Sequence, residues 1–144
     1  MVKKASILEV EEIANLAMCL WKGHSFEDLK NEFKDIITNN NGVVFIKYVD
    51  QMAVGFAQCQ LRVDYVEGTE SSPVGYLEGI FVLKDYRLNG FAKELVKQCE
   101  IWAKGNGCVE FASDCEIDNV TSLNFHKAIG FKEKNRIICF AKNI

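Results

Sequence analysis

Apolar side chains recur along the first forty residues at the spacing of amphipathic helices. Ser6 and Glu9 form a capping-box pattern, and the apolar positions that follow predict a helix over residues 7–20. A second helix is predicted to begin at Ser25 and to end at the Asn- and Gly-rich run 39–42, since these residues commonly close helices. Two consecutive helices are therefore expected near the start of the chain, and any strand before Ser6 must be very short.

Three stretches in the middle of the chain have the composition of strands. Residues 42–49 and 53–64 are rich in β-branched and aromatic residues, and the short turn at 50–51 predicts that they pair as an antiparallel hairpin. A third strand is predicted over residues 76–83. Gly79 lies inside it, and an interior glycine often marks a bulge or the close approach of a ligand to the backbone.

The second half of the chain alternates helices and strands. Helical spacing predicts helices over residues 90–104 and 119–128, and short apolar runs predict strands over 109–113 and 136–142. No linker or repeat interrupts the chain. The order of elements predicts a single α/β domain over residues 1–144, with a mixed sheet flanked by helices.

Charge and hydropathy exclude several classes of function. The chain carries 17 Lys and Arg against 20 Asp and Glu, a net charge of −3, so it lacks the basic surface that nucleic-acid binding requires. Its apolar runs are far shorter than the roughly 20 residues that span a bilayer, and acidic residues interrupt the position of a signal-peptide core. We expect a cytoplasmic protein without a membrane partner, for which a cationic small molecule is an acceptable ligand.

The cysteines do not form a metal-site pattern. None of the six stands in a CxxC motif, and the chain has only two histidines. We expect reduced, mainly structural thiols and no metal ion.

A strand, a glycine-containing turn and a helix N-terminus follow one another before the third predicted helix. The turn consists of Arg87, Leu88, Asn89, Gly90, Phe91 and Ala92. Unpaired N–H groups of a first helical turn attract anions, and small residues let a pyrophosphate approach the backbone. By itself the pattern also fits an ordinary helix start with glycine at its cap.

Two carboxylates and two ring side chains are further candidates. Glu78 lies in an otherwise apolar strand, where a carboxylate is costly to bury unless it is paired or functional. Asp114 ends a predicted strand, where it could instead cap a turn. Trp21, at the end of an apolar helix face, and the aromatic Tyr65 could each belong either to the packing or to a site.

The Arg-x-x-Gly-x-Ala spacing of residues 87–92 resembles the coenzyme A pyrophosphate loop of the GCN5-related N-acetyltransferase (GNAT) superfamily. About thirty residues downstream, Asn119, Ser122 and the Gly130-Phe131 pair look like the second motif of that superfamily. More specifically, the segments RVDYVEGTESSPVGYLEGIFV and CEIWAKGNGCVEFASD, with Leu20-Trp21, look like those of the aminoglycoside 6'-N-acetyltransferases.

The resemblance implies a fold and a set of roles. The sheet would be split near Gly79, with acetyl-coenzyme A in the split. Acceptor contacts would come from Trp21, Tyr65, Glu78 and Asp114. The acetyl and pantetheine portion would lie on backbone groups of Ile80, Phe81 and Val82. The turn 87–92 would hold the pyrophosphate, and Asn119 the pantetheine arm. Relatives carry an acidic, drug-binding residue where this chain has Asn135, and they suggest a homodimer.

The implied activity is direct transfer of acetyl from acetyl-coenzyme A to the 6'-amino group of an aminoglycoside, which would confer resistance to the drug. Glu78 is the candidate general base and Asp114 the orienting or alternative carboxylate. His126 could donate a proton to the departing thiolate or could simply pack at the end of its helix. Acetylation of another amine, such as a peptide N-terminus, a lysine or a polyamine, and a non-catalytic coenzyme A-binding domain remain the alternatives.

Overall fold

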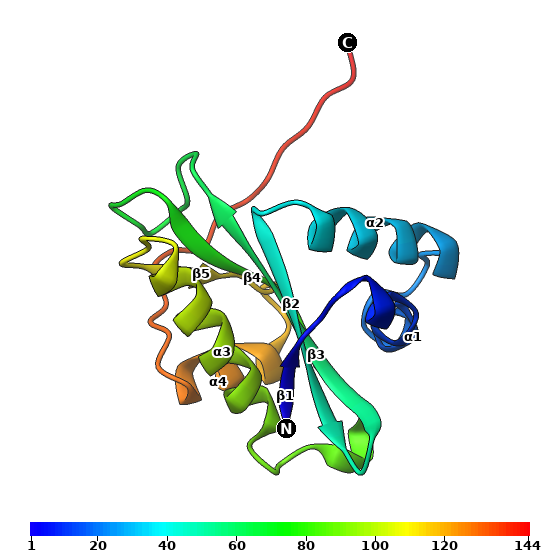
Figure 1. The fold of residues 1–144 in the computed structure, drawn as a ribbon. Helices are drawn as coiled ribbons and strands as arrows, with labels where there is room; N and C mark the ends of the chain where they lie inside the picture. Colours follow the sequence, from blue (N-terminus) through cyan, green and yellow to red (C-terminus); the bar gives the residue numbers. More distant parts are fainter.

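Five strands form one mixed sheet with helices on both faces in the computed structural model, which describes residues 1–144 (Figure 1). The strands are β1 (Val2–Lys4), β2 (Gly42–Val49), β3 (Met52–Arg62), β4 (Val74–Val82) and β5 (Phe111–Ser113), and they neighbour one another in that order. The pairings β1–β2, β2–β3 and β3–β4 are antiparallel, whereas β5 runs parallel to β4. The predicted mixed α/β sheet is confirmed.

Two pairs of helices cover the sheet. They are α1 (Val10–Leu20), α2 (Phe26–Thr38), α3 (Phe91–Gly105) and α4 (Val120–Ala128), with short 3-10 helices at Ile7–Glu9 and Lys84–Tyr86. In Figure 1, α1 and α2 lie on one side of the sheet and α3 and α4 on the other. None of these helices combines the length and the apolarity that crossing a bilayer requires.

Alternation along the strands divides the buried side chains into two cores. Ile46 and Phe56 face α1 and α2, whereas their neighbours Phe45 and Ala57 face α3. Successive side chains of a strand point to opposite faces, so the continuous apolar runs of β2 and β3 fill both cores.

Local signals place the helix starts and the hairpin turn. Ser6 and Glu9 form the expected reciprocal capping box, and the Ser25 hydroxyl accepts a hydrogen bond from the Asp28 N–H at 3.1 Å. Asp50 and Gln51 both have positive φ, the conformation of a tight hairpin turn. These sequence-based predictions are confirmed, although the first helix starts with a 3-10 turn.

Glu78 occupies a bulge in β4. Gly79 pairs with Gln58 and Leu77 with Cys59, so Glu78 has no partner residue on β3. The pairing of β4 with β5 also ends at this point, at Leu77 and Ser113. The predicted split of the sheet near Gly79 is therefore present, and Glu78 lies beside it.

The predicted closing strand over residues 136–142 is wrong for the isolated chain. Residues after Phe131 form no helix or strand, and Figure 1 shows the C-terminal segment extending away from the sheet. Its apolar residues Ile137, Ile138 and Phe140 are 61%, 80% and 90% exposed. The composition is that of a strand, but a strand needs a neighbour for its backbone hydrogen bonds, and the chain gives it none.

Candidate functional site

The side chain of Glu78, in the bulge of β4, forms an ion pair with Arg62. Arg62, the last residue of β3, donates from Nε and Nη2 to Oε1 at 3.0 and 2.8 Å and from Nη2 to Oε2 at 2.8 Å. The Glu78 side chain is 19% exposed and that of Arg62 is 43% exposed. The predicted burial of a carboxylate in this strand is therefore compensated by a bidentate ion pair.

Tyr76 connects this ion pair to the second candidate carboxylate. The Arg62 guanidinium lies 3.5 Å from the centre of the Tyr76 ring, and the Tyr76 hydroxyl donates a hydrogen bond to Asp114 Oδ2. Burial raises the pKa of Tyr76 well above its ordinary value, and the Asp114 carboxylate raises it further. A tyrosine is protonated at physiological pH even at its ordinary pKa near 10, so Tyr76 acts as the hydrogen-bond donor to Asp114. The structure thus brings Glu78 and Asp114 into one network.

His126 of α4 is held by two hydrogen bonds. Its Nδ1 lies 2.7 Å from the Ser122 carbonyl oxygen, which can only accept, so Nδ1 carries a proton. Its Nε2 lies 2.8 Å from the Ser113 hydroxyl, and its ring contacts those of Phe125 and Phe131. The same Ser113 hydroxyl also lies 3.3 Å from the Leu77 carbonyl oxygen, and both nitrogens of the His126 ring are occupied by protein partners.

The second half of β4 offers backbone donors on the side of the split. The Leu83 N–H donates to the Val54 carbonyl on β3 at 2.8 Å. Since successive N–H groups of a strand point in opposite directions, those of Ile80 and Val82 point away from β3 and that of Phe81 points toward it. β5 does not extend alongside these residues. Two of the three residues expected to contact acetyl and pantetheine thus present N–H groups to the split.

The turn before α3 leaves the first helical N–H groups open. Gly90 is the N-cap residue in the left-handed conformation, with φ of 79°, and no side chain caps the helix. The first intrahelical donor is the N–H of Glu94, which bonds to the Gly90 carbonyl, so the preceding N–H groups have no helical partner. Leu88 also has positive φ and is fully exposed. Arg87 Nε donates to the Val82 carbonyl at 2.8 Å, which ties the turn to the end of β4.

Asn119 begins α4. Its side-chain oxygen accepts a hydrogen bond from the Ser122 N–H at 3.0 Å, which makes it the N-cap residue. Its side-chain amide donates no hydrogen bond to the protein and can bind a ligand. The residue thus has a structural role that is compatible with the expected contact to the pantetheine arm.

Trp21 lies between the core and the bulge. Its ring centre is 6.2 Å from that of Phe33 and 6.0 Å from that of Phe56, and its edge occupies the space that a Cβ atom at Gly79 would take. Trp21 therefore packs in the core, as one of its two interpretations expected, and its ring also adjoins Gly79, the residue next to Glu78. Tyr65, in contrast, is 76% exposed on the loop between β3 and β4.

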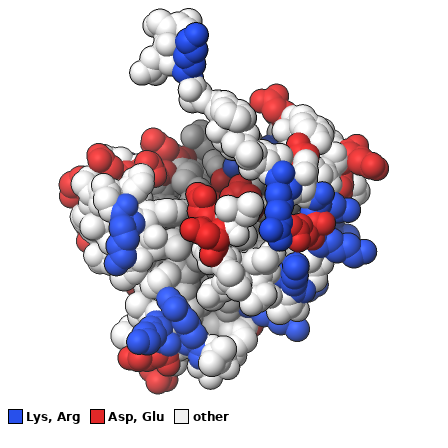
Figure 2. Space-filling model, turned by 180° about the vertical axis from the view of Figure 1, so that it is seen from behind, with Lys and Arg blue, Asp and Glu red and all other residues white.

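The loop between β3 and β4 is tied to the chain after α4. The Asn135 amide donates to the Glu67 carboxylate at 2.7 Å, and a side chain at Gly68 would collide with Lys134. Figure 2 shows this back of the molecule, with acidic side chains around a hollow below the C-terminal segment. Since residue 135 is an amide here, it neutralises no charge on Glu67 and adds none.

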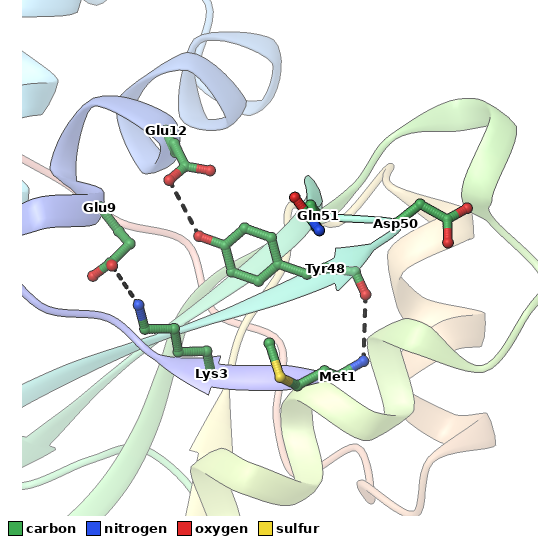
Figure 3. A pocket seen from close by; sticks show the side chains of 7 residues that line it. All are labelled: Met1, Lys3, Glu9, Glu12, Tyr48, Asp50 and Gln51. Carbon is green, nitrogen blue, oxygen red and sulfur yellow. Dashed lines mark hydrogen bonds and ion pairs between the residues drawn. The ribbon is translucent and has the colours of Figure 1, made fainter.

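A pocket of about 490 Å³ lies elsewhere, at the N-terminus (Figure 3). It is lined by Met1, Lys3, Glu9, Glu12, Tyr48, Asp50 and Gln51. Most of its polar groups bind one another: Lys3 pairs with Glu9, Tyr48 donates to Glu12 at 3.2 Å, and the N-terminal amine donates to the Tyr48 carbonyl at 3.3 Å. It contains none of the predicted site residues.

Arg62, Tyr76 and Ser113 are members of the network that the sequence did not single out as functional. The pairing of β3 with β4 and of β4 with β5 brings these side chains to the candidate residues. The bulge shifts the register between β3 and β4. A signal was present for Tyr76, which stands two residues before Glu78 and so shares its face of the strand.

Known proteins share both this sequence pattern and this architecture. Residues 10–131 match the acetyltransferase (GNAT) family. The chain belongs to this family. It is 45% identical over 130 residues to an aminoglycoside N(6')-acetyltransferase type 1 of Acinetobacter baumannii, which covers 90% of this chain and 88% of the relative. It is 37% identical to the enzyme of the same name from Acinetobacter haemolyticus, over 99% of this chain and 98% of that one.

Solved structures of this family superpose over the whole chain. The aminoglycoside acetyltransferase AAC(6')-Iy, in complex with a bisubstrate analogue of coenzyme A and acetylneamine, has a TM-score of 0.96 at 36% identity. The alignment covers 100% of this chain and 98% of that one. AAC(6')-Iy with coenzyme A gives a TM-score of 0.97, again at 36% identity, and covers 95% of that chain. The resemblance noted in the sequence is confirmed for family and fold.

Proposed function

We propose that the protein transfers an acetyl group from acetyl-coenzyme A to the 6'-amino group of aminoglycosides. The observation that carries this proposal is the pair of carboxylates, Glu78 and Asp114, beside the point where β4 and β5 part. An aminoglycoside is a polycation, and carboxylates can orient its ammonium groups through charge-assisted hydrogen bonds. The names of the relatives support this substrate class.

The donor is proposed to bind along β4 and the start of α3. The N–H groups of Ile80 and Val82 can hydrogen-bond the pantetheine arm and the thioester oxygen. The open N–H groups at the start of α3 suit a pyrophosphate, because the helix dipole favours negative charge there. Arg87, Leu88, Asn89, Gly90, Phe91 and Ala92 form this pyrophosphate loop, and Asn119 contacts the arm.

The reaction is a direct transfer. The 6'-nitrogen forms a bond to the acetyl carbonyl carbon, the carbon–sulfur bond breaks, and coenzyme A leaves as a thiolate. The attacking nitrogen must lose a proton, which passes to Glu78 directly or through a water molecule. Asp114, fixed by Tyr76, orients the acceptor, and Trp21 and Tyr65 contact its rings.

We assign His126 a positioning role in this scheme. Its two nitrogens are occupied by the Ser122 carbonyl and the Ser113 hydroxyl. An imidazole with both nitrogens engaged in this way has no spare N–H for the departing thiolate. The thiol of coenzyme A has a pKa of roughly 8.5, as in a free cysteine, so the thiolate leaves without much need of a proton donor.

The experiment that tests the function uses two aminoglycosides that differ only in a 6'-amine or a 6'-hydroxyl. The purified protein is incubated with acetyl-coenzyme A and each drug, and products are identified by mass, because the exposed thiols of Cys19 and Cys139 would react with a thiol dye. We expect one added acetyl group on the 6'-amino drug alone. If neither drug is acetylated while coenzyme A binds, either the acceptor is a different amine, such as a polyamine, a lysine or a peptide N-terminus, or the protein is a non-catalytic coenzyme A-binding domain.

We further propose a cytoplasmic homodimer. All six cysteines are free and three of them are buried, which suits a reducing compartment. The exposed apolar side chains of residues 137–140 and the edge strand β5, which has only β4 as a neighbour, are unusual for a monomer. Pairing of this segment with a second copy would bury both.

A further inference from the structure

Arg62 holds the Glu78 carboxylate in a fixed orientation. It is the last residue of β3, opposite Val74, and its side chain crosses the face of Tyr76 to reach Glu78. The guanidinium is thus fixed on two sides, by stacking on a ring that is itself buried and by three hydrogen bonds to one carboxylate.

The three hydrogen bonds are unequally divided between the two oxygens of Glu78. Oε1 accepts two of them, from Nε and from Nη2, whereas Oε2 accepts only one, from Nη2. A carboxylate oxygen has two lone pairs, so Oε2 keeps one for a further donor and Oε1 does not. The pair therefore selects one oxygen of Glu78 for an acceptor ammonium or a water molecule.

The Arg62 guanidinium also affects the position of Asp114, through Tyr76. Tyr76 lies beneath Arg62 and donates to Asp114, so the plane of its ring is fixed by the stacking while its hydroxyl is directed at Asp114. One side chain, which donates to Glu78 and stacks on the tyrosine that donates to Asp114, thus holds the geometry of both acidic groups.

We propose that Arg62 is a positioning residue for acetyl transfer: through its fork on Glu78 and its stack on Tyr76 it directs Glu78 Oε2 toward the acceptor amine. The inference rests on the proposed role of Glu78. It goes beyond charge neutralisation, because a lysine would supply the charge without the planar fork or the stack. Orientation by Arg62 therefore affects the rate of the bound complex more than its formation.

The test compares Arg62→Lys, Arg62→Gln, Glu78→Gln and the double variant Arg62→Gln/Glu78→Gln in the full-length protein. Lys30→Gln, which breaks an exposed ion pair with Glu11, is the matched control. For each protein we measure kcat and KM for a 6'-amino aminoglycoside by product mass, the Kd of coenzyme A by calorimetry, and Tm. Tm and coenzyme A binding give the fraction of folded protein, and dividing the observed rate by this fraction separates a change in kcat from unfolding.

We expect both Arg62 variants to lose about tenfold or more in kcat with coenzyme A affinity unchanged, because neither lysine nor glutamine reproduces the bidentate fork. KM for the drug in Arg62→Gln should not rise, because removing the guanidinium makes the site more negative toward a polycation. The double variant should have the kcat of Glu78→Gln alone, since residues that act as a unit are not additive.

Three results would overturn the inference. They are wild-type kcat in both Arg62 variants, a raised KM at unchanged kcat, or losses that multiply in the double variant. If Glu78→Gln itself keeps the wild-type kcat, the proposed role of Glu78 fails, and the inference fails with it. If Glu78→Gln is impaired while the Arg62 variants are not, only the role of Arg62 is wrong.

Discussion

The ring of Trp21 fills the space in which a side chain of Gly79 would lie. A Cβ atom at Gly79 would be 2.6 Å from Cζ2 and 2.7 Å from Cη2 of this ring. Trp21 in turn packs on Phe33 and Phe56 of the core on the α1 side. The bulge that carries Glu78 is therefore supported from below by an aromatic cluster, so core packing and site geometry are coupled.

This contact makes Gly79→Ala a sensitive test of the bulge. The added methyl group has to displace the Trp21 ring or the strand, and overpacking of this kind costs about 1–3 kcal/mol. We expect a lower free energy of unfolding by urea denaturation and a lower kcat. Gly105→Ala is the control, because a Cβ there meets nothing within 4 Å and lies in helix α3. Equal stability of Gly79→Ala and the wild type would contradict the close packing.

Glu78→Gln removes the charge of the proposed base but keeps its size. We expect kcat/KM for a 6'-amino aminoglycoside to fall by roughly 10²-fold, the usual contribution of a general base. Coenzyme A affinity should be unchanged, since the proposed donor contacts lie on β4 backbone groups and α3. Glu11→Gln, an exposed position on α1, serves as the control. Wild-type kcat/KM in Glu78→Gln would remove this residue from proton transfer.

Those parts of the fold that depend on neighbouring residues in the chain could be predicted from the sequence. The capping box of Ser6 and Glu9 and the bulge beside Gly79 follow from local chemistry and are present. The contact of Arg62 with Glu78 could not be predicted, because it depends on the register of two strands, which the bulge shifts by one residue. Trp21 shows a limit of hydrophobic patterns: helical spacing alone cannot tell whether a side chain packs in the core, lines the site or, as here, does both.

The segment 136–142 shows a different limit. Its β-branched and aromatic residues have the composition of a strand, but composition does not say which strand will be its neighbour. In the isolated chain no neighbour is available, and the side chains are exposed. The strand propensity of residues 136–142 was therefore read correctly, but the prediction that they form a strand is wrong for the isolated chain.

Gly90→Val tests the proposed pyrophosphate loop. Gly90 has φ of 79° and open space around it, so valine adds strain and also a side chain where the phosphate is expected. Gly107→Val is a matched control, because Gly107 has φ of 87°, is equally open, and lies beyond the opposite end of α3. Both variants should lose about 1–2 kcal/mol of stability. Only Gly90→Val should weaken coenzyme A binding in calorimetry; equal affinities in the two variants would argue against the loop.

Glu9 should make the protein sensitive to acid. Hydrogen bonds from Lys3 and Ser6 lower the pKa of this buried carboxyl from its ordinary value to about 2. A lowered pKa stabilises the folded state above the ordinary value, and this contribution is lost as the pH falls from about 4.5 toward 2. Glu9→Gln should therefore cost on the order of 2 kcal/mol at pH 7 and little near pH 2. Urea unfolding at several pH values measures this; a constant difference across the range would refute the assignment.

The exposed C-terminal segment predicts that dimer formation depends on its apolar side chains. Ile138→Lys places a charge on a residue that is 80% exposed in the single chain, so the folded monomer should tolerate it. In a dimer that buries this residue, an unpaired lysine would be strongly unfavourable. We therefore expect light scattering to give twice the chain mass of 16.3 kDa for the wild type and the monomer mass for Ile138→Lys. Lys142→Glu, a charge change in the same segment that removes no apolar side chain, is the control and should stay dimeric. A wild-type monomer, or a dimer that survives Ile138→Lys, would show that this segment does not mediate association.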